Sequence, residues 1–284
     1  MRIFLAGAAG VIGRSLVPML VEAGHEVVGT TRSPTRFALL EALGARPVLI
    51  DVFDRERLHV AIEREKPEVV IHQLTDLNGH DLAGNARLRV EGTHNLIDGA
   101  LAVGVRRVIA QSIAFVSVPG LGPAGEDEAL DLDAPHPRRR TVEGVYALEK
   151  AVRDLEDAVV LRYGTLYGAG TWYASDGAIA QRVRRGELPT NDAVTSFVHV
   201  ADAARAALLA LDWPAGTFNV VDDEPAPARD WLPVYAEALG APAPPAGSGR
   251  RPWERGASNA RARRELGWQP RFPSWREGFR TALG

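Results

Sequence analysis

The 284-residue sequence contains no cysteine, which excludes disulfide bonds, thiolate catalysis and cysteine metal sites. No apolar run approaches the ~20 residues that a membrane-spanning helix needs. Neither charge sign dominates: the formal net charge of −3 gives no reason to expect nucleic acid or an anionic membrane as a partner. Met1 and Arg2 lead directly into an apolar strand, so we expect no signal peptide and a cytoplasmic setting.

Several catalytic motifs are also missing. There is no G-x-S-x-G elbow of the kind that hydrolases use. The seven histidines show no metal-ligand spacing, so no metal site is expected. A phosphate-binding P-loop fails because Gly13-Arg14-Ser15 lacks the lysine and Ala8 stands where the earlier glycine would be.

Strands and helices alternate through the first 112 residues. Apolar runs typical of buried parallel strands lie at Ile3–Ala6, Val27–Gly29, Pro47–Ile50, Val69–Ile71 and Arg107–Ala110, with helical apolar spacing between them. This alternation predicts a Rossmann-like, doubly wound parallel sheet of the α/β class.

The second half is less regular. Pro119–Thr141 is rich in glycine, proline and charge and is expected to be a long surface loop, followed by a helix from about Val142. Further elements are expected as strands at Val159–Arg162, Thr195–Val200 and Thr217–Val221, as helices at Gly177–Arg185, Ala201–Leu211 and Ser258–Gly267, and as a loop at Gly240–Pro252. We therefore expect a dinucleotide-binding domain at residues 1–168 and a small C-terminal substrate lobe at 169–284, with about 195–221 returning to the main domain.

Three glycines follow the first expected strand with the spacing Gly7-x-x-Gly10-x-x-Gly13. Glycine at a strand-to-helix turn permits positive φ and lets backbone approach a pyrophosphate closely. The backbone N–H groups of Val11, Ile12 and Gly13, together with the helix dipole, would then hold the negative charge. The pattern favours a dinucleotide site over an ordinary glycine-rich turn because it lies at the first strand of a βαβ unit.

The end of the second strand indicates which dinucleotide. An NAD site usually has an acid there, which binds the ribose hydroxyls, whereas this chain has Thr31, Arg32 and then Arg36. Arginine binds phosphate through charge-assisted hydrogen bonds, so the sequence favours NADP(H) over NAD(H), the alternative being a solvated basic helix start. Asp51 and Val52 end the third strand and are expected beside the adenine, with helix capping by Asp51 as the alternative.

Tyr146 and Lys150 are four residues apart and share one helix face. A free phenol titrates near ~10, too high for a general base at neutral pH, and a nearby ammonium favours the phenolate. Such a pair can pass a proton to or from a substrate oxygen while a nicotinamide transfers hydride. The same spacing also occurs on ordinary amphipathic helices, so it needs its context.

That context is the order of the motifs. The glycine turn and the Tyr146–Lys150 pair are followed by characteristic segments at Leu161–Gly170, Phe197–Ala204 and Ser258–Trp268. In this order they resemble the extended short-chain dehydrogenase/reductase family, specifically the NAD-dependent epimerase/dehydratase group. The resemblance covers most of the chain.

The resemblance implies roles for individual residues. Tyr146 would be the acid/base and Lys150 its ribose-binding partner. Gln73, Leu74 and Thr75 would belong to the fourth-strand loop beside the cofactor, and Tyr163 would lie near the nicotinamide. The family often forms dimers through the helices around Asn85–Val103 and Val142–Leu155, so a homodimer is an expectation.

The chain departs from the family pattern in three ways. The family's Ser or Thr hydroxyl after the fifth strand is replaced by Ile113, with Ser112 one residue early. Since neighbouring strand residues face opposite ways, Ser112 substitutes only if the backbone bends, and Ser117 is another candidate. The segment from Ser112 to Tyr146 is longer than usual, and Arg89 stands where the family carries an asparagine.

The sequence favours an NADP(H)-dependent oxidoreductase acting on a carbonyl or secondary alcohol of a small polar substrate, with Tyr146, Lys150 and Ser112 as the catalytic residues. One alternative is a nucleotide-sugar epimerase or dehydratase, in which the cofactor is oxidised and reduced within one cycle. Another is an NADP-binding regulator with weak or lost catalysis, which Ile113 favours and the Tyr146–Lys150 pair opposes.

Overall fold

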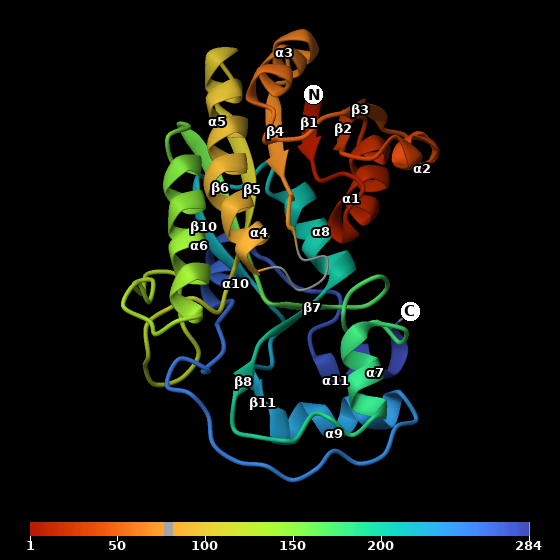
Figure 1. The fold of residues 1–284 in the computed structure, drawn as a ribbon, viewed down its shortest axis with the longest axis vertical. Coiled ribbons are helices and arrows are strands. Elements are labelled where there is room, and N and C mark those ends of the chain that lie inside the picture. The colour runs from red at the N-terminus through yellow and green to blue at the C-terminus, as the bar shows by residue number, and fades with distance from the viewer. Residues whose placement is uncertain (77–81, 284) are drawn as a thin grey trace. The chain divides into compact units, whose positions relative to one another are not determined.

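The computed structural model describes residues 1–76 and 82–283, and its main element is a seven-stranded parallel sheet. The strand order is β10-β6-β5-β4-β1-β2-β3 (Figure 1). The strands are β1 (Arg2–Ala6), β2 (Glu26–Thr31), β3 (Arg46–Leu49), β4 (Val69–His72), β5 (Arg107–Ile113), β6 (Asp157–Tyr163) and β10 (Gly216–Val220). The predicted Rossmann-like fold class is confirmed.

Helices connect these strands. They are α1 (Val11–Glu22), α2 (Phe37–Ala42), α3 (Arg55–Glu65), α4 (Leu82–Arg87), α5 (Thr93–Ala102), α6 (Arg138–Val152) and α8 (Val200–Leu209). A short 3₁₀ turn, η1 (Pro34–Arg36), precedes α2, and a π-helical turn, η3 (Leu88–Gly92), joins α4 to α5. No helix among the described residues is long and apolar enough to span a membrane.

The order of the sheet reverses at β1, which positions the glycine turn. β1 pairs with β2 on one side and β4 on the other, so that Phe4 lies opposite both Val28 and Val70. All three side chains are almost fully buried, as expected for parallel strands that are covered on both faces. Ligands of such sheets bind outside the carboxyl ends of the strands at the reversal point, where Gly7 follows β1.

The chain folds as two compact units, each built from three segments. The first comprises Met1–Ser112, Leu130–Leu161 and Ala204–Thr217, and the second comprises Ile113–Ala129, Arg162–Ala203 and Phe218–Gly284. In the first unit, one apolar core joins side chains of β1, β4 and β5 to α3, α5 and α6. Which unit binds substrate stays a prediction.

The second unit has an aromatic core. It contains the two-stranded pairs β8 (Val194–Thr195) with β11 (Ala226–Pro227) and β7 (Thr165–Tyr167) with β9 (Phe197–His199). It also contains α7 (Ala178–Arg184), α9 (Ala228–Ala238), α10 (Ala260–Leu266) and α11 (Trp275–Thr281). Phe197 contacts Tyr167, Trp231 and Phe279 edge-on, with ring centroids 5.2 to 6.2 Å apart.

The structure corrects several predicted elements. The loop predicted to reach Thr141 ends earlier, because α6 begins at Arg138 and its first turn is the basic run. The predicted strand Thr195–Val200 is divided at Ser196 into β8 and β9, which pair with different strands. Helices α9 and α11 were not predicted.

Candidate active site

The glycine turn has the geometry that its spacing predicts. Gly7 has a φ of +93°. A Cβ on Gly13 would lie 2.3 Å from the Gly7 carbonyl oxygen and 2.5 Å from that of Ala8, closer than any real side chain can approach. The N-cap of α1 is Gly10, which has no side chain that could accept from the N–H groups of the first turn. A helix N-terminus of this kind suits a pyrophosphate.

The fourth-strand loop lies against this turn. The backbone amide of Gln73 donates to the Ala6 carbonyl at 2.8 Å. A Cβ on Gly7 would lie 2.6 Å from the backbone carbonyl oxygen of Gln73. Gln111, on β5, donates from its side chain to the Leu74 carbonyl at 2.7 Å. Thr75 follows and is exposed. The structure thus brings the predicted Gly7, Gln73 and Leu74 together, and Gln111 is a supporting residue that sequence analysis missed.

The loop after β2 offers hydroxyls and guanidinium groups. Thr31 Oγ1 accepts from the Ser33 amide at 3.1 Å, and the Ser33 and Thr35 hydroxyls lie 2.7 Å apart. Arg32 and Arg36 are both exposed. Arg32 lies 3.5 Å from the Asp76 carboxylate, so one of the two cations already has an acidic neighbour.

Asp51 does not cap a helix, which corrects the capping alternative. The cap of α3 is Asp54, whose carboxylate accepts from the Arg57 amide. Asp51 is exposed and accepts from the Phe53 amide at 3.0 Å in a local turn. The adjacent Val52 side chain is buried, and its carbonyl accepts from Asn95 at 2.9 Å. Contact of Asp51 and Val52 with adenine stays a prediction.

Tyr146 and Lys150 lie on the exposed face of α6. Tyr146 is 45% exposed, although large apolar rings are usually buried, and Lys150 is exposed one turn later. The buried side of α6 carries Val145, Leu148 and Val152. Packing of α6 therefore presents the predicted pair to solvent and to any bound ligand.

Ser112 is oriented toward a partner that the sequence did not reveal. Its hydroxyl donates to Glu149 Oε1 at 2.8 Å, and Ser112 is only 4% exposed. Arg153 donates to the other oxygen of Glu149 at 3.1 Å. Glu149 is fully buried on the inner face of α6. The catalytic role of Ser112 stays a prediction, and this hydrogen bond weighs against it.

The signal for Glu149 was present in the sequence. Val142, Val145 and Val152 form an apolar stripe at helical spacing, and Glu149 falls on that stripe between them. A carboxylate on a buried stripe needs hydrogen-bond donors, which Ser112 and Arg153 supply here.

A buried cation lies close to Glu149. Arg89, in the π-helical turn η3, is 7% exposed, and its Cδ would lie 3.5 Å from a Cβ placed on Gly144 of α6. Burial lowers the pKa of Arg89 to about 10, and the charge of Glu149 opposes that change. A π-helical turn is a local distortion that is frequent at functional sites. Here it accommodates a guanidinium at the position where the family carries an asparagine.

His72, at the end of β4, is a neutral structural group. Burial, followed by the charge of Arg89, lowers the pKa of His72 to about 4. The Leu74 amide donates to Nδ1 at 3.2 Å, so Nε2 carries the proton and donates to Thr93 Oγ1 at 2.9 Å. This ring fixes the start of the fourth-strand loop.

Tyr163 is almost completely buried in the second unit. Its exposed fraction is 2%, and its hydroxyl donates to the Ala203 carbonyl at 3.2 Å. Its predicted place near the nicotinamide stays a prediction.

His199 and Asp202 both bind backbone groups. The His199 ring lies within hydrogen-bond distance of the Ala282 carbonyl, and the Asp202 carboxylate accepts from the backbone amides of Arg271 and Phe272, at 2.8 and 2.9 Å. Such contacts are what a structural role requires.

Comparison with known proteins gives relatives over the whole chain. The 3-diazoavenalumate denitrifying reductase of a Streptomyces species is 46% identical, over 98% of this chain and 99% of that protein. The 4-hydroxy-2-methyl-3-oxo-4-farnesyl-3,4-dihydroquinoline-1-oxide ketoreductase of Stigmatella aurantiaca is 28% identical, over 84% of this chain and 74% of that protein. Among solved structures, UDP-glucose 4-epimerase of Thermus thermophilus, in complex with NAD, is 27% identical, with a TM-score of 0.77 over 100% of this chain and 98% of that one.

The relatives are thus reductases and epimerases, and the resemblance inferred from the motifs is confirmed. Residues 3–220 match the sequence profile of the NAD dependent epimerase/dehydratase family. The protein is an enzyme that uses a nicotinamide dinucleotide, and it belongs to the NAD dependent epimerase/dehydratase family.

Proposed function

We propose that the protein is an NADP(H)-dependent reductase that transfers hydride to a small organic substrate. The observation that carries the proposal is the first unit itself. It combines an α1 N-terminus whose cap, Gly10, has no side chain, exposed arginines after β2, and Tyr146 with Lys150 on the exposed face of α6. The close packing at Gly13 fits a dinucleotide, because only a chain without a Cβ there brings the turn into this conformation.

Each residue has a chemical task in this proposal. The amides at the start of α1 bind the pyrophosphate, and Lys150 donates to the nicotinamide ribose. When bound, the reduced nicotinamide supplies a hydride. The hydride adds to the carbonyl carbon, the C=O π electrons move to the oxygen, and Tyr146 donates the proton of its hydroxyl to that oxygen.

Replacing Tyr146 tests the acid/base assignment. Tyr146→Phe removes only a hydroxyl on a half-exposed side chain, so stability should change by less than about 0.5 kcal/mol. Loss of a general acid should lower kcat by roughly 10²- to 10⁴-fold. NADPH oxidation and NADPH binding, measured on the same preparations, separate the two effects. Full turnover of a ketone by Tyr146→Phe contradicts the assignment.

The preference for NADPH rests on Arg32 and Arg36. A 2′-phosphate beside two exposed guanidinium groups gains charge-assisted hydrogen bonds that a ribose hydroxyl cannot match. Asp76 neutralises part of the charge of Arg32 across 3.5 Å. Removing that carboxylate should therefore strengthen NADPH binding.

Two variants test this preference by isothermal titration. Arg32→Ala should weaken NADPH binding by roughly tenfold or more, with little change for NADH, whereas Asp76→Asn should strengthen NADPH binding. An equal loss for both cofactors in Arg32→Ala contradicts the preference. If the Asp76 carboxylate instead binds the ribose hydroxyls of the cofactor, Asp76→Asn would weaken cofactor binding rather than strengthen it.

The first candidate acceptor is a carbonyl group. The Stigmatella relative is named as a ketoreductase. Ketone reduction requires a proton at the carbonyl oxygen, which Tyr146 can supply. A hydroxyl at the position of Ile113 would hold that carbonyl oxygen together with Tyr146. In this chain the neighbouring Ser112 hydroxyl donates to Glu149 instead.

The second candidate acceptor is a diazo group, and the same hydrogen bond favours it. The 46% identical relative is named for removing nitrogen from a diazo compound. In such a reaction an arenediazonium ion accepts one hydride, the C–N bond breaks, N₂ leaves, and the ring carbon gains hydrogen. No carbonyl oxygen needs a donor in this reaction. A site whose serine hydroxyl is committed to Glu149 is therefore compatible with it.

One assay separates the two acceptors. Purified protein is incubated with NADPH and either a panel of aldehydes and ketones or an arenediazonium salt, with absorbance at 340 nm and N₂ release both recorded. Tyr146→Phe and enzyme-free reactions serve as controls. Net NADPH consumption excludes an epimerase, whose cofactor is restored in each cycle. Tight NADPH binding with no consumption on any acceptor would overturn the reductase proposal and favour epimerisation or a cofactor-sensing role.

We also propose that the protein forms a homodimer through the α4–α5 and α6 helices. Leu82, Val90 and Leu101, on α4, η3 and α5, are 43 to 49% exposed, so these helices offer apolar side chains to a partner. Light scattering should give twice the 30.6 kDa chain mass, and Leu101→Glu should lower it. A monomeric mass for the unaltered protein contradicts this expectation.

A further inference from the structure

A hollow of about 200 Å³ lies in the second unit, at the carboxyl ends of two sheet strands. Ala114 follows the end of β5 and Gly164 follows the end of β6 directly, and both line the hollow. The Ala114 amide donates to the Tyr163 carbonyl at 2.9 Å, which holds these two strand ends together. Ligands of parallel sheets bind beyond this edge.

The lining of the hollow is small and uncharged. None of the described residues that line it is Asp, Glu, Lys, Arg or His. Ser196 lines it, but its hydroxyl is committed to the backbone of Ala257, to which it donates at the carbonyl and from which it accepts at the amide, each at 2.9 Å. A diphosphate brought here would lose its water without gaining a cation or an amide cluster, which is costly.

One large side chain stands at the hollow. Phe115 is 47% exposed and lines it, although a phenyl ring is normally buried. An exposed aromatic face beside a cavity gains free energy by stacking on a ligand ring. A cavity of about 150 Å³ lined by apolar side chains already holds benzene, so about 200 Å³ accommodates one substituted ring.

The wall behind the hollow is fixed by hydrogen bonds. The segment Gly256–Ala257 lines the hollow. Ala124 pairs with this segment: its backbone amide donates to the Gly256 carbonyl at 3.0 Å, and its carbonyl accepts from the Ser258 amide at 2.9 Å. Arg255 is 3% exposed and is paired with Glu128. These contacts hold residues 124–128 and 255–258 against one another.

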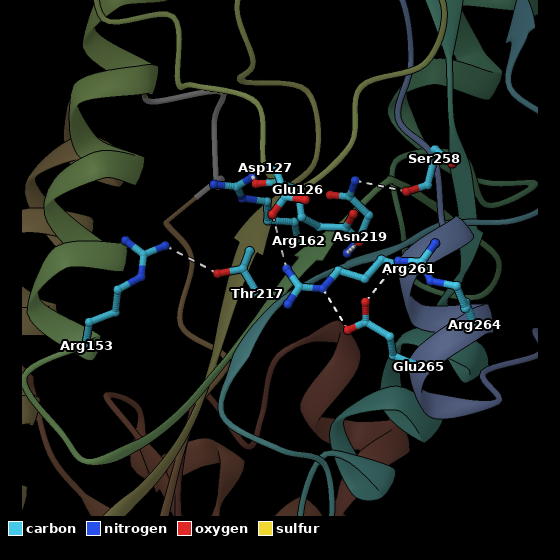
Figure 2. A network of polar contacts seen from close by, with 10 residues as sticks. All are labelled: Glu126, Asp127, Arg153, Arg162, Thr217, Asn219, Ser258, Arg261, Arg264 and Glu265. Carbon is cyan, nitrogen blue, oxygen red and sulfur yellow. Dashed lines mark hydrogen bonds and ion pairs between the residues drawn. The ribbon is translucent and has the colours of Figure 1, made fainter.

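Figure 2 shows how this wall continues. The side-chain amide of Asn219 donates to the Ser258 carbonyl at 3.0 Å, and its backbone amide donates to the Glu126 carboxylate at 2.8 Å. The same side chain also donates to the Ala124 carbonyl at 3.1 Å. Burial raises the pKa of the Glu126 carboxyl, and the Asn219 amide and the charge of Arg261 oppose that change. The Asn219 side chain and the Glu126 carboxylate are thus held by hydrogen bonds within this wall.

We propose that this hollow is the subsite for an uncharged, single aromatic ring of the substrate, and that it excludes nucleotide-sugar diphosphates. The proposal deepens the proposed reductase function by naming the substrate class. It rests on the volume, the uncharged lining, the exposed side chain of Phe115 and the hydrogen-bonded wall. The aromatic part of the substrate binds here, and a polar acceptor group on that substrate extends away from it.

Equilibrium binding tests the subsite without turnover. Full-length protein, with and without NADPH, is titrated with 4-phenyl-2-butanone and separately with UDP-glucose. Phe115→Ala should weaken binding of the aryl ketone by roughly 2- to 10-fold, the usual worth of an aromatic contact. Phe115→Leu, the matched control that keeps an apolar side chain, should lose less. Thermal unfolding curves confirm that each variant is folded.

A second pair of variants addresses the cavity volume. Thr195 lines the hollow and lies in strand β8, where an aromatic residue is compatible with the backbone. Thr195→Phe should fill the space and weaken binding at least about tenfold, whereas the isosteric Thr195→Val should bind as the unaltered protein does. UDP-glucose that binds more tightly than the aryl ketone, or aryl binding unchanged in both Phe115→Ala and Thr195→Phe, overturns the proposal. Because this readout needs no NADPH oxidation, a failure of the reductase function is seen separately, as aryl binding that is intact without turnover.

Discussion

Replacing Ser112 by alanine distinguishes a structural serine from a catalytic one. The serine hydroxyl donates to Glu149 at 2.8 Å inside the first unit, and Glu149 is fully buried. Removing the hydroxyl leaves a buried carboxylate with one donor fewer. Hydrogen bonds to charged groups contribute about 1.5 to 3 kcal/mol, so we expect a loss of stability in that range.

The loss should appear as a lower melting temperature. An unfolding entropy of about 2.1 cal/mol/K per residue means that 1 kcal/mol shifts the Tm of this 284-residue chain by roughly 1.7 °C, so Ser112→Ala should melt roughly 2.5 to 5 °C lower. A catalytic hydroxyl that holds the reacting oxygen would instead contribute roughly 10²- to 10³-fold to kcat. We expect kcat/KM to change by less than about fivefold, which corresponds to about 1 kcal/mol.

The assay is differential scanning calorimetry with steady-state NADPH oxidation on the same samples. Glu149→Gln is the matched variant, because its amide oxygen still accepts from Ser112 while its NH₂ group no longer suits Arg153. It should also be less stable. A Ser112→Ala protein with unchanged Tm and a hundredfold lower kcat would refute the structural interpretation and restore Ser112 to the catalytic set.

Two further predictions concern packing and pH. Gly13→Ala places a methyl group 2.3 Å from a backbone oxygen, so it should lower the free energy of unfolding by about 1 to 3 kcal/mol and weaken NADPH binding. In the control Gly125→Ala the methyl group meets nothing within 4 Å, so calorimetry and titration should both show no change. Burial raises the pKa of Asp222 to about 8, so the native state keeps a proton that the unfolded chain releases above about pH 4, and stability should fall as pH rises through this window to 8. In Asp222→Asn, whose amide oxygen can still accept from Trp275, Tm should fall less between pH 6.5 and 8; parallel Tm curves for the two proteins would contradict this.

The sheet was predictable because its strands are buried on both faces. Runs such as Ile3–Ala6 and Val69–Ile71 are continuously apolar, and that pattern has few alternatives when it alternates with helical spacing. Helix α9 was harder, because Pro233 lies inside it and suggests a break. Helix α11 has only seven residues, too few for periodicity to be convincing, and tertiary packing of Trp275 and Phe279 stabilises it.

In the candidate site, residues that the backbone conformation requires were predictable, whereas the directions in which side chains form hydrogen bonds were not. Gly13 is specified by a steric requirement that appears directly as a missing side chain. The direction of the Ser112 hydroxyl depends on Glu149, 37 residues later, and no local pattern encodes such a pairing. The start of α6 at Arg138 was missed because three arginines resemble a solvated loop, while Arg138 is held by Asp131 at 2.9 Å.

The interleaving of the two compact units has a consequence for synthesis. The first unit includes Ala204–Thr217, which the ribosome makes only after the second unit's Arg162–Ala203 segment has been synthesised. Domains usually fold as units and in order from the N-terminus, but here the first unit is complete only when its third segment has been made. A nascent chain that stalls before residue 204 therefore exposes apolar surface, and we expect chaperones to engage it until the third segment of the first unit arrives.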